Sequence, residues 1–203
     1  MRKTRLVFAA LLALAVSPAL AQAPQGIPTR IRGTIETFAG HSLAVDSRDG
    51  MRLTITLAPN FAVLGVAKRR LADLKPGDYV GVTAVTGTDG RQHAVEVHIL
   101  PEKMRGLGEG QRPWDLMPNS LMTNATVARV TAAPEEHVLH LTYKGGAAEF
   151  VIGPSTMIVG YVPGDPSLLK PGAAVFVIAF KQPDGSLKAM RVTAEKDGVK
   201  PPL

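Results

Sequence analysis

The residues in this chain that could do chemistry are few, and the histidines come first. His137 and His140 are three positions apart, and His93 and His98 are five apart. Successive side chains of a β-strand point to opposite faces, so residues at an odd spacing on a strand do not bind one metal ion together. Residues 134–136, Pro-Glu-Glu, precede His137 and are compatible with a turn. If His137 lies in that turn rather than in a strand, metal binding by the pair His137 and His140 stays an open alternative. We predict no metal site and no cofactor.

Catalytic side chains do not form a recognisable set. The chain has no cysteine and no Gly-x-Ser-x-Gly motif, which excludes a thiol nucleophile and a serine of that type. Ser42 stands beside His41, and Glu135 beside Glu136, but each pair falls in or near an expected turn, where such residues are ordinarily solvated. The glycine-rich stretch 106–110 has no apolar strand before it, unlike a phosphate-binding loop. We predict no catalytic residues and no enzyme activity.

The segment 101–124 is unusual for a linker. It contains the only tryptophan of the chain, Trp114, together with several methionine and leucine residues. Large apolar side chains in a loop ordinarily bury themselves, which favours a strap packed against the rest of the protein. The alternative is a binding loop that presents Arg112, Trp114, Asp115 and Asn119 to a partner. We name these four residues as the candidate binding site.

Charge narrows the class of partner. The whole chain has a net charge of +6, but three of its 23 basic residues lie in the first five positions. The remainder has 20 basic and 17 acidic residues, a net charge of +3. Aromatic residues make up 5% of the chain and do not alternate with basic ones, as a groove for single-stranded nucleic acid requires. We predict that the partner is a protein or a cell-envelope component and not a nucleic acid.

The first 21 residues have the three parts of a secretory signal peptide. A basic start, Met1–Arg5, precedes an apolar run at 6–16, and Ala19-Leu20-Ala21 is a small-x-small cleavage site. The apolar run is 11 residues long, and a membrane-spanning helix needs roughly 20. We therefore predict cleavage after Ala21, export to the periplasm and no membrane span.

Two copies of one β-rich unit must position these residues. The motif Leu-Lys-Pro-Gly at 74–77 returns 95 positions later at 169–172, and the segments 57–98 and 152–193 share 13 identities in 42 positions. Apolar and polar residues alternate in stretches such as Met51–Leu57, as in strands with one buried face. Five or six short strands per copy predict a small antiparallel barrel, because closure leaves no exposed sheet edge.

Several of these segments resemble a known family. They are the Gly33-Thr34-Ile35 start, the run Leu-Ala-Asp-Leu-Lys-Pro-Gly-Asp at 71–78 before a valine-rich strand, and a terminal Ala-x-x-Val strand. These features are similar to the DUF5666-type modules of bacterial exported proteins. The resemblance implies an OB-fold-like barrel and supplies no catalytic residue. The second copy has Ala173 where the first has Asp78, and it lacks the opening glycine.

Together these observations predict an all-β protein of two tandem, small antiparallel OB-like β-barrels joined by a structured linker. Its predicted parts are a signal peptide at 1–21, a flexible N-terminus at 22–29, barrels at 30–100 and 125–196, the linker or strap at 101–124, and a C-terminal tail at 197–203. We predict a periplasmic, non-enzymatic binding or scaffold protein that uses the loop and the cleft between the barrels. The alternative is a periplasmic carrier of a metal or small ligand in that cleft. The sequence does not predict the oligomeric state.

Overall fold

The computed structural model describes residues 26–132 and 136–201, whose regular structure is β-strand with three single-turn 3-10 helices. The predicted signal peptide falls outside the described residues. Among the described residues, no helix has the length and hydrophobicity of a membrane span. The strands are β1 (Ile27–Ala39), β2 (Ser42–Ser47), β3 (Arg52–Lys68), β4 (Tyr79–Thr86), β5 (Gln92–Ile99), β6 (Gly110–Pro113), β7 (Leu121–Ala132), β8 (His137–Tyr143), β9 (Gly146–Ile152), β10 (Met157–Pro163), β11 (Ala174–Lys181) and β12 (Leu187–Ala194), and the 3-10 turns are η1 (Leu71–Asp73), η2 (Glu102–Met104) and η3 (Pro166–Leu168).

Strands β1, β2, β3, β12 and β11 form a closed five-stranded barrel, here called lobe 1. Each strand pairs with the next around the ring, antiparallel except for the parallel pair β3–β12. Alternation with period two buries one face of each strand, so Leu43 and Val45 of β2 pack against Val175 and Val177 of β11 in one core. The predicted all-β, barrel-type fold is confirmed for this lobe.

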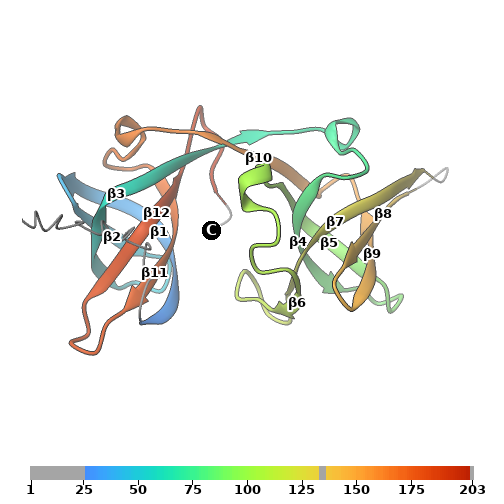
Figure 1. Cartoon of the computed structure of the whole chain (residues 1–203), viewed down its shortest axis with the longest axis horizontal. Helices are drawn as coiled ribbons and strands as arrows, with labels where there is room; N and C mark the ends of the chain where they lie inside the picture. Colours follow the sequence, from blue (N-terminus) through green and yellow to red (C-terminus); the bar gives the residue numbers. More distant parts are fainter. Residues whose placement is uncertain (1–25, 133–135, 202–203) are drawn as a thin grey trace, which may run out of the picture.

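Strands β4, β5, β7, β8 and β9 form a second five-stranded group, here called lobe 2. Its pairs β4–β5, β4–β7, β7–β8 and β8–β9 are antiparallel, and β5 meets β9 through one residue pair, His93 with Val151. A separate core cluster fills it, with Phe150 and Leu139 fully buried. Figure 1 shows the two lobes side by side.

Each lobe combines strands from both predicted repeats, which differs from our expectation that each repeat would close on itself. Lobe 1 combines β1–β3 of the first repeat with β11 and β12 of the second, and lobe 2 combines β4 and β5 with β7–β9. The hairpins β4–β5 and β11–β12 carry a similar pattern of buried positions. Sequence pattern alone does not choose between them.

Two strands cross between the lobes as a bridge. The 17-residue β3 leaves lobe 1 and pairs antiparallel with β10, over the top of the molecule in Figure 1. Val66 pairs with Tyr161, its own counterpart 95 positions later, and Leu64 pairs with Pro163, the counterpart of Lys68. The bridge is therefore self-complementary, and a pseudo-two-fold axis passes through the Val66–Tyr161 pair.

The chain ends also differ from expectation. β1 begins at Ile27, and its first residues pair with the end of β11 at Lys181, so 27–29 are strand rather than a flexible lead-in. Part of the predicted tail folds back through a bridge between Lys196 and Val199. This tail forms one wall of the groove described below.

Candidate functional site

Trp114 is held between arginine side chains. The guanidinium carbon of Arg30 lies 4.1 Å from the centroid of the Trp114 ring, and those of Arg32 and Arg112 lie 5.5 Å from it. The ring of Phe176 makes an edge contact at 6.4 Å between centroids. Arg30, Arg32 and Phe176 belong to lobe 1, whereas β6, which precedes Trp114, pairs with β7 of lobe 2. The segment therefore straps lobe 2 to lobe 1.

Asp115 and the backbone beside it continue this contact with lobe 1. Asp115 Oδ1 lies 2.9 Å from Nη1 of Arg32, whose side chain is 2% exposed. Burial lowers the pKa of Arg32, while the carboxylate of Asp115 opposes the shift. Arg48 donates hydrogen bonds to the carbonyl oxygens of Asp115 and Leu116. Arg30, Arg32 and Arg48 of lobe 1 thus all contact the turn of the strap at residues 114–116.

The structure brings three of the four predicted binding residues together. Arg112 and Asp115 flank Trp114, and Arg112 also donates a 2.5 Å hydrogen bond to the carbonyl of Gly108. Asn119 does not join them, because it lies exposed in a turn with φ of 59°. The contacts are internal, as the strap interpretation requires. A partner for this loop stays a prediction.

A buried polar cluster, here called the polar centre, lies beneath the bridge. Its members are Glu96 and His98 of β5, Tyr161 of β10 and Thr193 of β12, with Glu96, His98 and Thr193 no more than 5% exposed. His98 Nδ1 lies 3.2 Å from the Tyr161 hydroxyl, which also hydrogen-bonds to Thr193. Burial raises the pKa of the Tyr161 phenol, and the charge of Glu96 raises it further.

Sequence reasoning missed the polar centre. Glu96 and His98 are two positions apart on one strand, so they share a face, and this spacing was the available signal. His98 Nε2 lies 2.6 Å from Glu96 Oε1, but the two atoms are not aligned for a hydrogen bond. The polar centre joins β5 of lobe 2 to β12 of lobe 1 through Tyr161 of the bridge, with Glu96, His98 and Thr193 buried.

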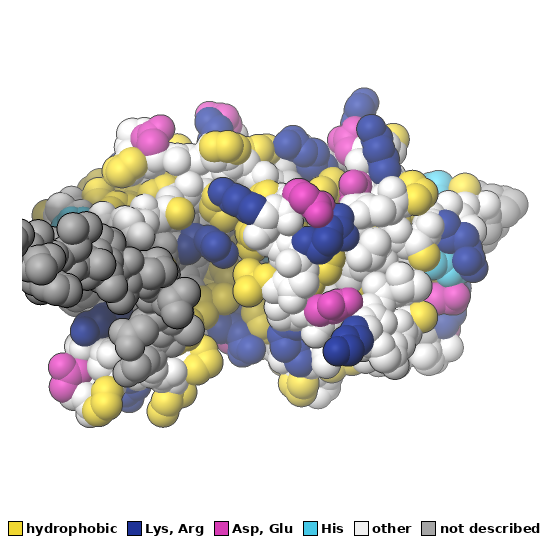
Figure 2. All heavy atoms as spheres, viewed as in Figure 1, with side chains coloured by type: hydrophobic (Ala, Val, Ile, Leu, Met, Phe, Trp, Pro, Cys, Tyr) yellow, Lys and Arg dark blue, Asp and Glu magenta, His cyan; other side chains and the backbone are white. Residues whose placement is uncertain are grey.

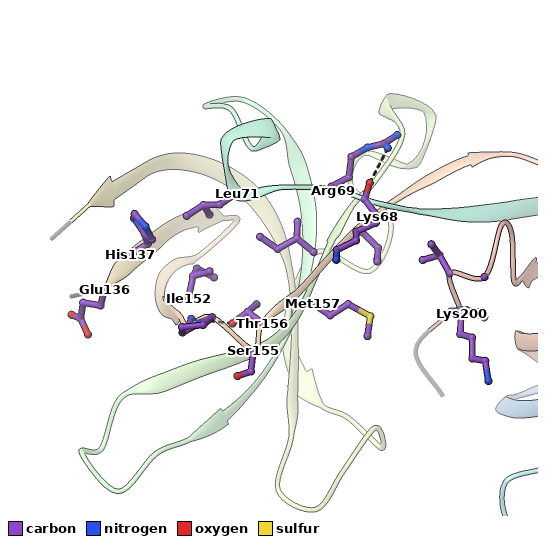
Figure 3. Close-up of a pocket in the computed structure, with 17 residues that line it drawn as sticks. Lys68, Arg69, Leu71, Glu136, His137, Ile152, Ser155, Thr156, Met157 and Lys200 are labelled. Atoms are coloured by element: carbon purple, nitrogen blue, oxygen red, sulfur yellow. Dashed lines mark hydrogen bonds between the residues drawn. The ribbon is translucent and has the colours of Figure 1, made fainter. Parts of the chain in front are cut away.

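A groove with a volume of about 1040 Å³ lies beside the bridge. We call it the bridge groove, and its residues are drawn in Figure 3. The end of β3, the turn between β9 and β10, and the C-terminal tail enclose it. In the turn, Pro154 lacks a backbone donor, and the Thr156 hydroxyl accepts from the Gly153 amide at 3.0 Å and donates to the Ala94 carbonyl at 2.7 Å. These bonds hold the turn that forms one side of the groove.

The bridge groove has an apolar floor and a basic end. Ile152 and Ile158 are buried beneath it, and Met157 is 50% exposed within it. In Figure 3, the Lys68 amine is turned into the groove beside Met157, and Lys200 lies beyond Met157 on the same side. A smaller hollow of about 380 Å³ lies on lobe 1, between β3 and the β11–β12 hairpin.

The histidine pair at 137 and 140 is divided between two faces, as strand spacing predicts. His137 is exposed and lines the bridge groove. His140 points to the opposite side, where Nδ1 lies 2.8 Å from Glu149 and Nε2 lies 3.0 Å from Thr131. No group of three or more His, Cys, Asp or Glu side chains suited to a metal ion occurs within residues 26–132 and 136–201.

Comparisons of the chain with protein-family models, curated proteins and solved structures find no match. The resemblance to DUF5666-type modules therefore stays a prediction.

Proposed function

We propose that this protein is an exported, non-enzymatic binding protein that holds its ligand in the bridge groove. The observation that carries the proposal is the groove itself, whose volume of about 1040 Å³ stands at the upper end of the roughly 300–1,000 Å³ of ligand pockets. Its apolar floor, bordered by polar side chains such as Lys68, Glu136 and Thr156, is similar in composition to such pockets. The strap is a weaker candidate, because Arg112, Trp114 and Asp115 are already engaged within the chain.

The hydroxyl groups described in the bridge groove contact no base, which supports a binding role there, although on the opposite side of β8 the Thr131 hydroxyl lies 3.0 Å from His140 Nε2 and His140 Nδ1 lies 2.8 Å from Glu149. In the groove, the Thr156 hydroxyl is engaged with backbone groups, and no described hydrogen bond joins Ser155 to a base. Ser167 and Lys170 stand at Ser-x-x-Lys spacing, but both are exposed and no described bond joins them. A serine nucleophile needs an adjacent base in contact with it.

We extend the proposal to the arrangement of the two lobes and to the location of the protein. We propose that lobes 1 and 2 are a strand-exchanged pair of OB-like barrels, exported to the periplasm after removal of 1–21. We propose a component of the cell envelope rather than a nucleic acid as the ligand, because the face of the molecule seen in Figure 2 has basic side chains interspersed with acidic ones. The self-complementary bridge supports the paired architecture.

Native mass spectrometry of the chain, purified from periplasmic extract, tests the binding function. We expect a non-covalent adduct that survives gentle ionisation. The variant Met157→Asp, which places a charge on the groove floor, should lose the adduct. The matched control Met51→Asp should retain it, because Met51 is similarly exposed (54% against 50%) and lies outside both hollows. A bare wild-type mass, or equal adducts in both variants, would contradict the proposal.

A further inference from the structure

The two ends of the bridge groove differ in charge. Lys68 and Lys200 stand at one end, and neither forms an ion pair with a described carboxylate. At the other end, Glu136 accepts two hydrogen bonds from Nη1 of Arg91, at 2.7 and 2.8 Å, which compensate its charge. Arg69 donates to the Lys68 carbonyl, and in Figure 3 its guanidinium points away from the groove. The uncompensated charge at this end is therefore that of the two lysines, with the Lys68 amine turned toward Met157 and Lys200 at the rim, its side chain extended away from Met157 in Figure 3.

Between these ends, the floor is apolar. Met157 is one of the few large apolar side chains that are half exposed, and Ile152 and Ile158 continue the floor beneath it. Methionine adapts its shape to flexible apolar ligands. A floor of this kind suits an unbranched hydrocarbon chain, and each methylene buried on it strengthens binding about fourfold.

Strand β10 does not offer a free edge to a peptide where it lines the groove. Met157–Gly160 of β10 pairs in parallel with β5, and Val159–Pro163 pairs with β3 on the other side. Binding by strand addition requires an unpaired edge. A peptide would therefore lack backbone partners along β10, whereas an alkyl chain needs none.

We propose that the ligand of the bridge groove is an anionic amphiphile, with one hydrocarbon chain on the Met157 floor and a carboxylate or phosphate head group between Lys68 and Lys200. This inference rests on the proposed binding function and names the chemistry of its ligand. A fatty acid and a lipid phosphate share that chemistry, and the experiment separates them.

Titration calorimetry with four twelve-carbon probes below their micelle concentrations tests the head group. The probes are dodecanoate, dodecyl phosphate, dodecanol and dodecyltrimethylammonium. We expect at least one of the two anions to bind about tenfold more tightly than dodecanol, and the cation to bind most weakly. The stronger of the two anions identifies the source as carboxylate or phosphate.

Variants place the charge effect in the groove. The double variant Lys68→Gln/Lys200→Gln should weaken anion binding about tenfold, to the level of dodecanol. The control Lys170→Gln should not change it, because Lys170 is exposed and lines neither hollow. Thermal melts of each variant check that the fold is retained.

The outcomes separate the two proposals. Equal binding of dodecanol and the anions, or equal loss in Lys170→Gln, overturns the head-group assignment. If no probe binds while native mass spectrometry still shows the Met157-dependent adduct, the ligand class is wrong and the binding function stands. If neither experiment detects binding, both proposals are wrong.

Discussion

Replacement of Trp114 by alanine tests whether the strap fastens the two lobes. The change removes the ring that Arg30 and Arg32 of lobe 1 contact at 4.1 and 5.5 Å, and its edge contact with Phe176. It also removes one of the two aromatic rings, Trp114 and Phe176, that the buried guanidinium of Arg32 contacts. We expect the strap to loosen and the free energy of unfolding to fall.

The magnitude follows from these contacts. A cation over an indole ring contributes about 0.5–1 kcal/mol at exposed sites and about 2 kcal/mol when desolvated. An edge-to-face aromatic pair adds about 0.5–1.5 kcal/mol. Arg30 is partly exposed and Arg32 is buried, so the expected loss for Trp114→Ala is about 3 kcal/mol.

Urea denaturation followed by far-UV circular dichroism measures this loss in residues 22–203. Trp114→Phe keeps an aromatic face and should lose about 1 kcal/mol. Met117→Ala, in the same loop and 42% exposed, should change the free energy by less than about 0.5 kcal/mol. A value for Trp114→Ala within about 0.5 kcal/mol of wild type would refute the fastening role.

Two further predictions concern the polar centre and the strand exchange. Burial raises the pKa of Tyr161 above that of an unfolded tyrosine, which is near 10. The contribution of Tyr161 to the free energy of unfolding is therefore complete below about pH 10. Above that pH the contribution falls by up to ~1.4 kcal/mol per pH unit. Tyr161→Phe should therefore cost about 1 kcal/mol at pH 7.5 and less at pH 11; equal costs in urea melts at both pH values would contradict this. In the cysteine-free chain, Ile27→Cys with Lys181→Cys should form a disulfide that peptide mapping detects, because these residues pair across β1 and β11. Ile27→Cys with Thr86→Cys should not form a disulfide. If each repeat instead closed on itself, this second pair would form the disulfide and the first pair would not.

Local features of the fold could be predicted from the sequence. The period-two alternation in Met51–Leu57 matches β3, and the Asp-Gly pairs at 49–50 and 89–90 mark turns in which Gly50 and Gly90 have φ near 75°. These signals depend only on residues close in the chain. The combination of strands from both predicted repeats does not, because the hairpins β4–β5 and β11–β12 have a similar pattern of buried positions.

The candidate site likewise has one part that the sequence predicts and one part that it does not. The sequence correctly indicated that Trp114 packs against the protein. The prediction follows because an exposed indole in a loop is costly. The bridge groove could not be predicted, because its walls come from the end of β3, the turn before β10 and the tail. Lys68 and Lys200 are far apart in the chain, and no spacing rule connects them.

The most direct test of the binding site is a crystal structure of residues 22–203 with dodecyl phosphate. We predict that the alkyl chain lies along Met157 in the bridge groove and that the phosphate lies between Lys68 and Lys200. Density for the ligand in the smaller hollow on lobe 1 or beside Trp114, with none in the bridge groove, would contradict the account.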